Sequence, residues 1–595
     1  MKRNRLLIGI VACSISLSLV LSNRVITGSA AVTDFNGNKA PVNPDFINYQ
    51  KNKSSSAFTI IDASGKKRIL GEVPAPLKLP DSSKSMASEA SFPSSFDLRT
   101  SGKVSSVKDQ SFSGSCWAFA TYGSLESNLL PTERRDFSEN NLKNNSGFSY
   151  DPNYGGNDSM STAYLARWSG PINESDDPYN PSSTSSPIDK TVQKHIQEVL
   201  FIPGRTGPWD NSTLKSALMT YGAIYTTMRW DNNCYNSTNK TYYKSNKDYI
   251  NHAVTIVGWD ENFDRNKFLD NNTGKMPAGN GAFIIKNSWG TSFGENGYFY
   301  ISFYDASAFF NNSVFNGAED SKNYSRVYQY DPLGWVQSFG FTTNTDTAWF
   351  ANVFTASSNE ELSAVSFYTP VVNSGYSVYV SSNYTGTSSL NSRTLKGSGV
   401  ISLPGYHTIK LNSTETLTAG KNFAVIVKLT TPGYGYPIPV ERSIPGYSDA
   451  ASSNSGESFC SSDSFGASTS WEDIHSVDSS ANVCLKAFTK PSANTTINPV
   501  RYGGIDRFET AAKVSASGWA TSANVVLVNG QGFADALIGV PFAHLKDAPI
   551  LLTNADYLPD FTNNEIARLE AKNIYILGGT GVVSAALENS LKAKG

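Results

Sequence analysis

The pattern of apolar residues changes twice along this chain, near residues 330 and 490, and no single fold accommodates all three patterns. Residues 92–330 predict a helical half followed by a β-rich half. Over residues 331–489, short alternating runs are separated by Gly, Ser, Asn and Pro turns, which predicts a β-sandwich. After a polar, proline-containing linker at 490–499, strands alternate with helices over residues 500–595. The fold class is therefore multidomain α+β, and 595 residues exceed what one core holds together.

One short run around Cys116 carries the clearest chemistry. Gln110 lies six residues before this thiol, and the Gly114-Ser115-Cys116-Trp117 sequence leads into an aromatic-rich segment that predicts a helix. A thiol at a helix N-terminus feels the positive end of the helix dipole, which favours the nucleophilic thiolate. We therefore predict that Cys116 is a nucleophile and that the Gln110 amide binds a developing oxyanion.

The base that serves this thiol must come from five histidines: His195, His252, His407, His475 and His544. Only His252 opens a dense β-branched run, which predicts a core strand that holds the ring firmly at one end. We expect His195 on a surface helix, His407 and His475 in loops or edge strands, and His544 in an Ala/Leu helix.

A second buried strand follows His252 and ends at Asn287 and Trp289. An asparagine side-chain oxygen can accept the imidazole N–H, which fixes the tautomer and the angle of the ring. We predict that Asn287 orients His252 in this way and that Trp289 shields the bond from water.

The order Gln–Cys–His–Asn is similar to that of the papain family of cysteine peptidases. Further segments at plausible spacing carry the resemblance: 92–99, 114–117, 137–142, 154–156, 287–290 and 294–299. The resemblance implies a papain-like fold over residues 92–330, with a cleft between its two halves. It also implies a catalytic set of Cys116, His252, Asn287 and Gln110, with substrate bound along Gly155, Gly156 and Trp289. No metal or organic cofactor is expected for catalysis.

The chain departs from the family at one pair of positions. Many relatives carry a disulfide between the positions that hold Ser113 and Asn153 here. Both halves are missing together, so we expect the bridge to be absent without consequence for catalysis. The other cysteines besides Cys116 are few for an exported chain; Cys460 and Cys484 could pair, but we favour free thiols.

The first 91 residues predict export and control. Residues 1–30 show a basic start, an apolar stretch and small residues before a cut near Ala31, which is typical of a signal peptide. An uncleaved membrane anchor is the alternative. Residues 31–91 are rich in proline and end in a serine-rich stretch, which we interpret as a propeptide that covers the nucleophile; a plain linker is the alternative.

The two C-terminal regions resemble modules of bacterial surface proteins. The sandwich at 331–489 is similar to lectin-like domains that follow some surface peptidases; carbohydrate binding and a purely spacing role both stay open, as does a structural calcium ion. Residues 500–595 resemble a clostridial cell-wall-binding repeat, present as a single or truncated copy, which implies binding to an anionic wall polymer. The net charge of −2 indicates no nucleic-acid partner.

Taken together, this order of regions resembles the clostridial peptidases that process the surface layer. The resemblance implies a secreted, wall-associated cysteine endopeptidase, made as a zymogen, that cleaves a surface-layer precursor into mature subunits and also host matrix proteins as a virulence factor. Two other classes are weighed against it. One is a surface adhesin with an inert protease fold, which the presence of all four catalytic residue types disfavours. The other is a wall-lytic enzyme, which the Gly155-Gly156 and Trp289 elements disfavour.

Overall fold

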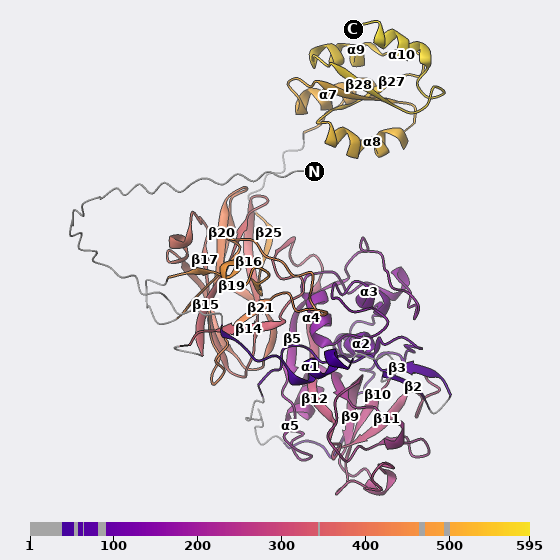
Figure 1. Ribbon diagram of the computed structural model, residues 1–595, viewed down its shortest axis with the longest axis vertical. Coiled ribbons are helices and arrows are strands. Elements are labelled where there is room, and N and C mark those ends of the chain that lie inside the picture. The colour runs from indigo at the N-terminus through magenta and orange to yellow at the C-terminus, as the bar shows by residue number, and fades with distance from the viewer. Residues whose placement is uncertain are drawn as a thin grey trace, which may run out of the picture. The chain divides into compact units, whose positions relative to one another are not determined.

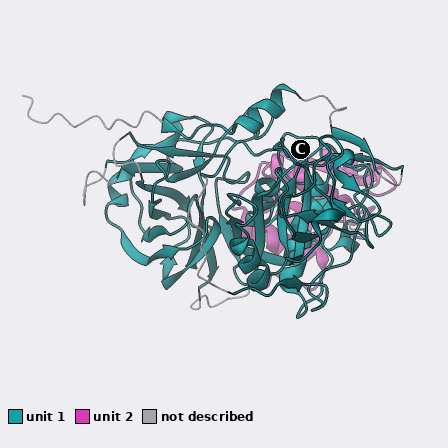
Figure 2. Cartoon of the chain, turned by 90° about the horizontal axis from the view of Figure 1, so that it is seen from below, with its two compact units in different colours: residues 1–493 teal, residues 494–595 magenta. Residues whose placement is uncertain are grey.

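The computed structural model describes residues 38–52, 58–62, 65–80, 91–342, 346–462, 470–492, 500–532 and 534–594. The predicted signal peptide at 1–30 lies outside these ranges, as does most of the predicted linker at 490–499. The chain divides into two compact units, residues 1–493 and 494–595 (Figure 2). Within the described ranges, we find no helix of the length and apolarity that crossing a membrane requires.

The helical half of the first unit is built around one central helix, α2 (Cys116–Leu129). Nearly every residue of α2 is buried, so the helix is covered on all sides rather than along one stripe. Its neighbours are α3 (Glu139–Asn144) and α4 (Asp158–Ala166), each begun by a side-chain cap from Ser138 or Asn157. This packing fixes the N-terminus of α2, and with it Cys116.

The β half presents strand β9 (His252–Asp260) to this helix. Gly123 of α2 faces Thr255 of β9, and a Cβ atom at this glycine would lie 2.7 Å from the Thr255 hydroxyl oxygen. The close approach brings the start of β9 next to the start of α2. The remaining elements of the half are β4 (Ser95–Asp97), α5 (Ser212–Tyr221), β6 (Ile224–Met228), β7 (Tyr235–Asn236), β8 (Thr241–Tyr242), β10 (Ala282–Lys286), β11 (Tyr298–Ser302) and β12 (Ala308–Asp320).

Residues 326–491 form the predicted sandwich. One sheet has the order β18-β17-β20-β15-β22-β23, and it packs on β13, β25, β16 and β19 through a shared core that includes Phe350, Val378 and Phe367. The strands are β13 (Arg326–Tyr328), β14 (Gln337–Gly340), β15 (Thr347–Thr355), β16 (Glu360–Thr369), β17 (Ser374–Ser381), β18 (Thr394–Ile401), β19 (Gly405–Leu417), β20 (Asn422–Thr430), β21 (Ile438–Glu441), β22 (Ser458–Ser462), β23 (Glu472–Asp473), β24 (Asn482–Val483) and β25 (Leu485–Pro491), with one helix, α6 (Ile474–Val477).

The peptidase and the sandwich share a sheet. Strand β5 (Lys194–Ile202) pairs with β12 on one side and with β19 of the sandwich on the other, through Leu200, Val199 and Glu198. Backbone pairing therefore runs from β13 to β7 through both regions, across the predicted boundary at residue 330. The sequence pattern gave no indication of this junction.

The N-terminal residues also fold onto both regions. Strand β1 (Asn38–Lys39) pairs with β14 of the sandwich, and α1 (Pro44–Lys51) places Phe46 edge-on against Tyr447, with ring centroids 5.5 Å apart. The hairpin of β2 (Thr59–Ile61) and β3 (Lys67–Ile69) follows, in the indigo part of the ribbon (Figure 1). This part of the predicted propeptide is thus packed against the rest of the unit.

Three of the histidine placements differ from expectation. His195 lies in β5 rather than on a surface helix, because this run pairs with β12; it is buried, and its ring stacks on Trp168 with centroids 3.7 Å apart. His407 lies within β19, between β16 and β5, rather than in a loop or at an edge. His475 lies in the short helix α6. His544 lies in helix α8, as predicted.

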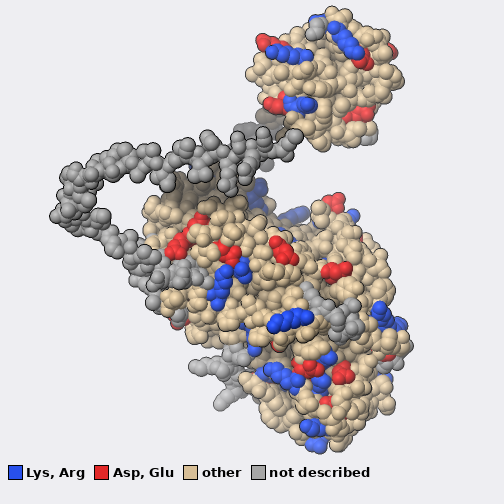
Figure 3. Space-filling view, in the orientation of Figure 1, with Lys and Arg blue, Asp and Glu red and all other residues tan. Residues whose placement is uncertain are grey.

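The second unit is a parallel three-stranded sheet with helices, as the alternating pattern predicts. Strand β26 lies between β27 and β28, and its buried apolar residues contact helices on both faces. The elements are α7 (Arg507–Gly518), β26 (Asn524–Asn529), α8 (Ala534–Leu545), β27 (Ile550–Thr553), α9 (Asp560–Arg568), β28 (Asn573–Leu577) and α10 (Ala585–Lys592). Over the face of the molecule shown in Figure 3, basic and acidic side chains are interspersed.

Candidate active site

Cys116 is the first residue of α2, as predicted, and its thiol is completely buried. The preceding residue, Ser115, hydrogen-bonds through its hydroxyl to Tyr179 rather than to the helix N-terminus. The backbone N–H of Ala253, the second residue of β9, points at the Cys116 sulfur at 3.5 Å. The thiol therefore lies where the two halves meet, at the start of the strand that His252 opens.

His252 and Asn287 are joined as the sequence predicts. The His252 Nε2 and Asn287 Oδ1 atoms are 2.9 Å apart, and both side chains are buried. With the proton on Nε2, Nδ1 is left as the acceptor, and it has no hydrogen-bond partner among the described residues. The Trp289 ring lies 5.0 Å from the imidazole, so this indole covers the bonded pair.

The side-chain amide of Gln110 is fixed by hydrogen bonds at both its oxygen and its nitrogen. Its Oε1 accepts a 2.6 Å hydrogen bond from the Ser288 hydroxyl, so the N–H side is turned toward the seam between the halves. Nε2 donates to the carbonyls of Ser113 at 2.8 Å and Ile69 at 3.2 Å. The Gln110 amide, which we predicted to bind an oxyanion, is therefore already hydrogen-bonded to a carbonyl of the N-terminal region, that of Ile69.

Residues 66–77, which we call the crossing segment, lie in the seam, by which we mean the boundary between the helical half and the β half. The Gly156 N–H donates to the Gly71 carbonyl, and the Val73 N–H donates to the Gly156 carbonyl, both at 3.0 Å. Between them, the Glu72 N–H donates to Asn251, the residue before His252, at 3.1 Å. The segment thus binds the helical half on one side and the β half on the other, directly over Cys116.

Three glycines permit this fit. A Cβ atom at Gly71 would lie 1.8 Å from the Gly114 carbonyl oxygen, and one at Gly156 would lie 2.3 Å from the Trp117 ring. A Cβ at Gly155 would lie 2.6 Å from the Val73 side chain. Gly155 and Gly156 therefore lie beside the extended chain in the seam, where the family resemblance places substrate.

A polar pocket receives the Glu72 side chain. Tyr225 donates its hydroxyl proton to Glu72 Oε2 at 2.5 Å, and the whole carboxyl group is buried. Burial raises the pKa of Glu72 well above its usual value, and the nearby Asp158 carboxylate raises it further, against the Tyr225 hydrogen bond. Asp158 is itself hydrogen-bonded by Ser313, and burial raises its pKa.

The predicted preference of Cys116 for the thiolate is not seen while the crossing segment is in place. Burial and, next, the charge of Glu72 raise the pKa of Cys116 to about 12. Burial lowers the pKa of His252 to about 4, against the hydrogen bond to Asn287. Both groups are therefore neutral near pH 7, because the segment excludes the water that would solvate their charged forms.

The absent family disulfide is replaced by a hydrogen bond. The Ser113 hydroxyl donates to Asn153 Oδ1 at 3.0 Å, and Lys143 also donates to that oxygen at 2.7 Å. All four cysteines in the described ranges carry free, buried thiols, including Cys460 and Cys484. The expectation of free thiols is thus met for these residues.

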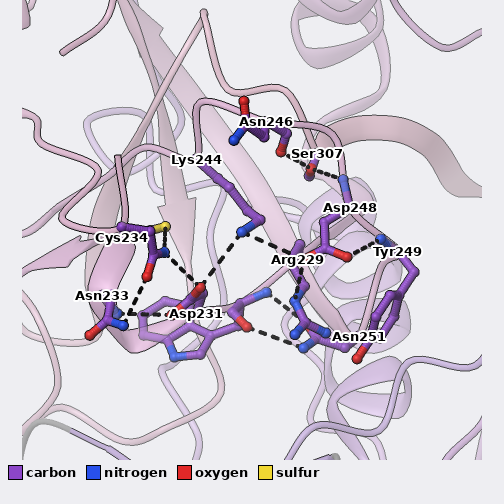
Figure 4. Close-up of polar contacts among 12 residues, drawn as sticks. Arg229, Asp231, Asn233, Cys234, Lys244, Asn246, Asp248, Tyr249, Asn251 and Ser307 are labelled. Atoms are coloured by element: carbon purple, nitrogen blue, oxygen red, sulfur yellow. Dashed lines mark hydrogen bonds and ion pairs between the residues drawn. The ribbon is translucent and has the colours of Figure 1, made fainter. Parts of the chain in front are cut away.

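Cys234 is also a free, buried cysteine, but it lies in a different environment (Figure 4). Its backbone N–H donates to the Asp231 carbonyl at 2.9 Å, and Asp231 pairs with Lys244 at 3.6 Å. Burial, with the charges of Asp231 and Asp270, raises the pKa of this thiol to about 12. No histidine contacts Cys234 among the residues described, so it lacks the arrangement found at Cys116.

Sequence reasoning missed three residues that shape the seam: Arg68, Glu72 and Asp109. Arg68 and Glu72 lie in a proline-rich stretch without periodicity, and the lysine-lysine-arginine run at 66–68 was its only conspicuous signal. Asp109 directly precedes Gln110, so its position beside the oxyanion-binding amide could have indicated it.

No group of three His, Cys, Asp or Glu side chains in the described ranges is placed to hold a metal ion. A calcium ion held by other oxygen ligands in the sandwich stays a prediction.

Family models match three parts of the chain. Residues 92–314 match the papain family of cysteine proteases, residues 327–489 a lectin-like domain, and residues 501–588 cell wall binding domain 2. Among curated relatives, pro-cathepsin H of Mus musculus is 31% identical over 226 residues, which is 35% of this chain and 60% of that protein. An N-acetylmuramoyl-L-alanine amidase of Bacillus subtilis is 36% identical over 105 residues, 18% of this chain and 21% of the amidase. The chain thus spans less than two thirds of either relative.

Solved structures extend the likeness across two domains. The cysteine protease and lectin-like domains of Cwp84, described as a surface layer associated protein of Clostridium difficile, align with a TM-score of 0.65 and 26% identity. That alignment covers 78% of this chain and all of the Cwp84 chain. Cwp84 after propeptide cleavage aligns with a TM-score of 0.58 and 27% identity, over 67% of this chain and 99% of the other.

Fold and site together define a papain-like cysteine peptidase, and residues 92–314 match the papain family of cysteine proteases. In this chain the peptidase is followed by a lectin-like domain and a cell wall binding domain. The first two of these share the architecture of Cwp84 from Clostridium difficile, so the chain is a multidomain relative of that protease.

Proposed function

We propose that the chain is the zymogen of a cell-wall-associated cysteine endopeptidase that cleaves the precursor of a surface-layer protein. The observation that carries this proposal is the placement of the Cys116 sulfur beside the first residues of β9, where Asn287 orients His252. The cell wall binding domain would hold the enzyme at the wall through an anionic polymer. Cwp84 is described as surface layer associated, which supports a surface-layer protein as the substrate.

The residues support acyl transfer by a thiolate. Once the crossing segment leaves, water and the α2 dipole would favour transfer of the Cys116 proton to His252. The Cys116 sulfur would attack the peptide carbonyl, and the Gln110 amide, freed from Ile69, would bind the oxyanion together with the Cys116 N–H. His252 would protonate the leaving amine and then activate the water that releases the acyl group.

The crossing segment would escape cleavage because it runs backward. His252 protonates the leaving amine, and its ring packs on Trp289, so the leaving half of a substrate lies toward Trp289. A substrate would therefore run from the Gly156 side toward Trp289 in the N-to-C direction. The crossing segment contacts Trp289 through Arg68 and Gly156 through Val73, which is the opposite direction. In agreement with this direction, the β-bridge between Glu72 of the crossing segment and Gly156 is parallel.

A direct test uses the full chain with a site for an unrelated protease engineered within residues 81–90. We call the product of that cut, freed of its N-terminal part, the released enzyme. It is expected to cleave purified surface-layer precursor into two subunits and to degrade casein, while leaving peptidoglycan intact. If the released enzyme cuts no protein substrate, the proposed peptidase function is wrong; lysis of peptidoglycan would place the chain among wall-lytic enzymes.

The Glu72 pocket predicts that inhibition weakens as pH rises. A peptide of residues 38–80 added to released enzyme carries Glu72 with an ordinary pKa, near 4.3, when free. The pKa is raised on docking, so the complex takes up a proton. Above the free pKa and below the docked pKa, the inhibition constant should then rise by up to about tenfold per pH unit.

The matched variant for this prediction is a Glu72→Gln peptide, which keeps the shape and the hydrogen bond but does not titrate. Inhibition constants measured from pH 5 to 8 should be nearly flat for this variant. A slope for the glutamine peptide as steep as that of the wild type would assign the titration to another group.

A further inference from the structure

Arg68 of the crossing segment occupies a pocket that is built to hold a guanidinium group. The side chain is only 1% exposed. Nη1 donates to Asp109 Oδ1 at 2.5 Å and to the Ser111 carbonyl at 3.1 Å, and Nη2 donates to the Trp289 carbonyl at 3.1 Å. The guanidinium carbon also lies 5.6 Å from the centre of the Trp289 ring. The remaining partner is Asp62, which Nε contacts at 2.8 Å.

All of these partners except Asp62 belong to the peptidase itself. The Asp109 carboxylate also accepts the Ser111 N–H at 2.8 Å, so a local turn fixes its position. Asp109 and Trp289 form an antiparallel bridge, and the Gly290 N–H donates to the Lys108 carbonyl at 3.0 Å. A carboxylate and two carbonyl oxygens are therefore held in one place by backbone pairing that does not involve the crossing segment.

The pocket lies on the leaving-group side of the reaction centre. It is flanked by Gln110, which follows Asp109 in sequence, and by Trp289, which packs on His252. Burial lowers the pKa of His252, and the charge of Arg68 lowers it further. A substrate residue that follows the scissile bond would pass this place, whereas Gly156 and the Glu72 pocket lie on the other side.

We propose that the pocket of Asp109, Ser111 and Trp289 is a substrate subsite that takes an arginine side chain on the C-terminal side of the scissile bond. The inference rests on the proposed peptidase function. When the crossing segment leaves, Asp109 loses both Arg68 and Lys66, whose Nζ lies 3.7 Å from Asp109 Oδ2, while its two carbonyl neighbours still face the same space. A planar guanidinium can meet a carboxylate and two carbonyls at once, so arginine is favoured over lysine. In the zymogen, Arg68 fills the subsite from a chain of reversed direction.

The test compares arginine with citrulline, which has the same shape without the charge. Internally quenched peptides would carry one or the other at each of the three positions after the scissile bond, and kcat/KM would be measured with released enzyme. Charge-assisted hydrogen bonds to a preformed site correspond to a preference of about 10- to 100-fold. We expect that preference for arginine at one of the three positions. Equal rates at all three would overturn the inference, and this comparison needs no variant.

The Asp109→Asn variant locates the effect. It keeps the oxygen that accepts the Ser111 N–H but removes the charge, so the arginine-to-citrulline ratio should fall toward one. Because the readout is a ratio within one enzyme, it does not depend on the variant's overall rate. Asp189→Asn removes the same charge from an exposed position and should leave the ratio unchanged. A ratio that survives in Asp109→Asn would assign the preference to other residues.

A peptidyl coumarin amide separates this inference from the proposed function, because it has no residues after the scissile bond. Hydrolysis of the coumarin substrate without any preference for arginine would overturn the subsite alone. Failure of the released enzyme to hydrolyse either kind of substrate would overturn the proposed function instead.

Discussion

Replacement of Cys116 by alanine is expected to lower kcat/KM of the released enzyme by at least about 10⁴-fold, because no other group can supply the nucleophile. The thiol is buried at the start of α2 and contacts the first residues of β9, so alanine removes one sulfur atom from a site that is otherwise held by backbone. The fold should persist, and the thermal midpoint measured by circular dichroism should change little compared with the loss of activity.

Cys234→Ala is the matched control for this experiment. Cys234 is also a buried free cysteine, and its thiol pKa is also raised to about 12, but it hydrogen-bonds Asp270 rather than lying beside a histidine. This variant should retain hydrolysis of surface-layer precursor and of peptidyl coumarin. Cleavage by the Cys116→Ala protein at a rate close to that of wild type would rule out the mechanism, whatever the control shows.

The second large effect concerns Gly71, where the crossing segment packs against Gly114, two residues before the nucleophile. An alanine Cβ there would lie 1.8 Å from the Gly114 carbonyl oxygen and 2.6 Å from the Gly114 Cα, and neither backbone atom can move without shifting the start of α2. The segment would have to lift away. Overpacking against rigid backbone corresponds to a loss of about 100-fold or more in affinity.

Two measurements check this prediction. A Gly71→Ala peptide of residues 38–80 should inhibit released enzyme with an inhibition constant about 100-fold higher than the wild-type peptide. The intact Gly71→Ala chain should hydrolyse peptidyl coumarin without any cut. Lys67→Ala, at an exposed position of β3, should behave as wild type in both assays. An unchanged inhibition constant for Gly71→Ala would mean that the close contact does not hold the segment in place.

The sequence predicted the parts of the site that local patterns determine. Cys116 begins a helix and His252 begins a strand because glycine, serine and β-branched runs specify those elements locally. The bond between His252 and Asn287 could be predicted because the family order carries it. The protonation of the pair could not, because it depends on Glu72 and on burial by a segment that lies far before Cys116 in the chain.

Part of the seam could not be predicted because its contacts are made by backbone. Gly71, Val73 and Gly156 pair through main-chain atoms, which leave no side-chain pattern in the sequence. The same holds for the pairing of β5 with β19, and it explains why His195 was expected on a surface helix. The polar residues of that run suggested an exposed element, whereas β5 is buried along most of its length.

That shared sheet has a mechanical consequence. If the C-terminal unit holds the protein to a wall, any pull on it enters the first unit at β25, the last strand before the connection. The load then spreads through β16 and β19 into β5 by hydrogen bonds between neighbouring strands, and from β5 through β12 and β6 to β9. Tension would therefore pass from the lectin-like domain to the peptidase through hydrogen-bonded strands rather than through a hinge. The orientation of the lectin-like domain would then set the orientation of Cys116.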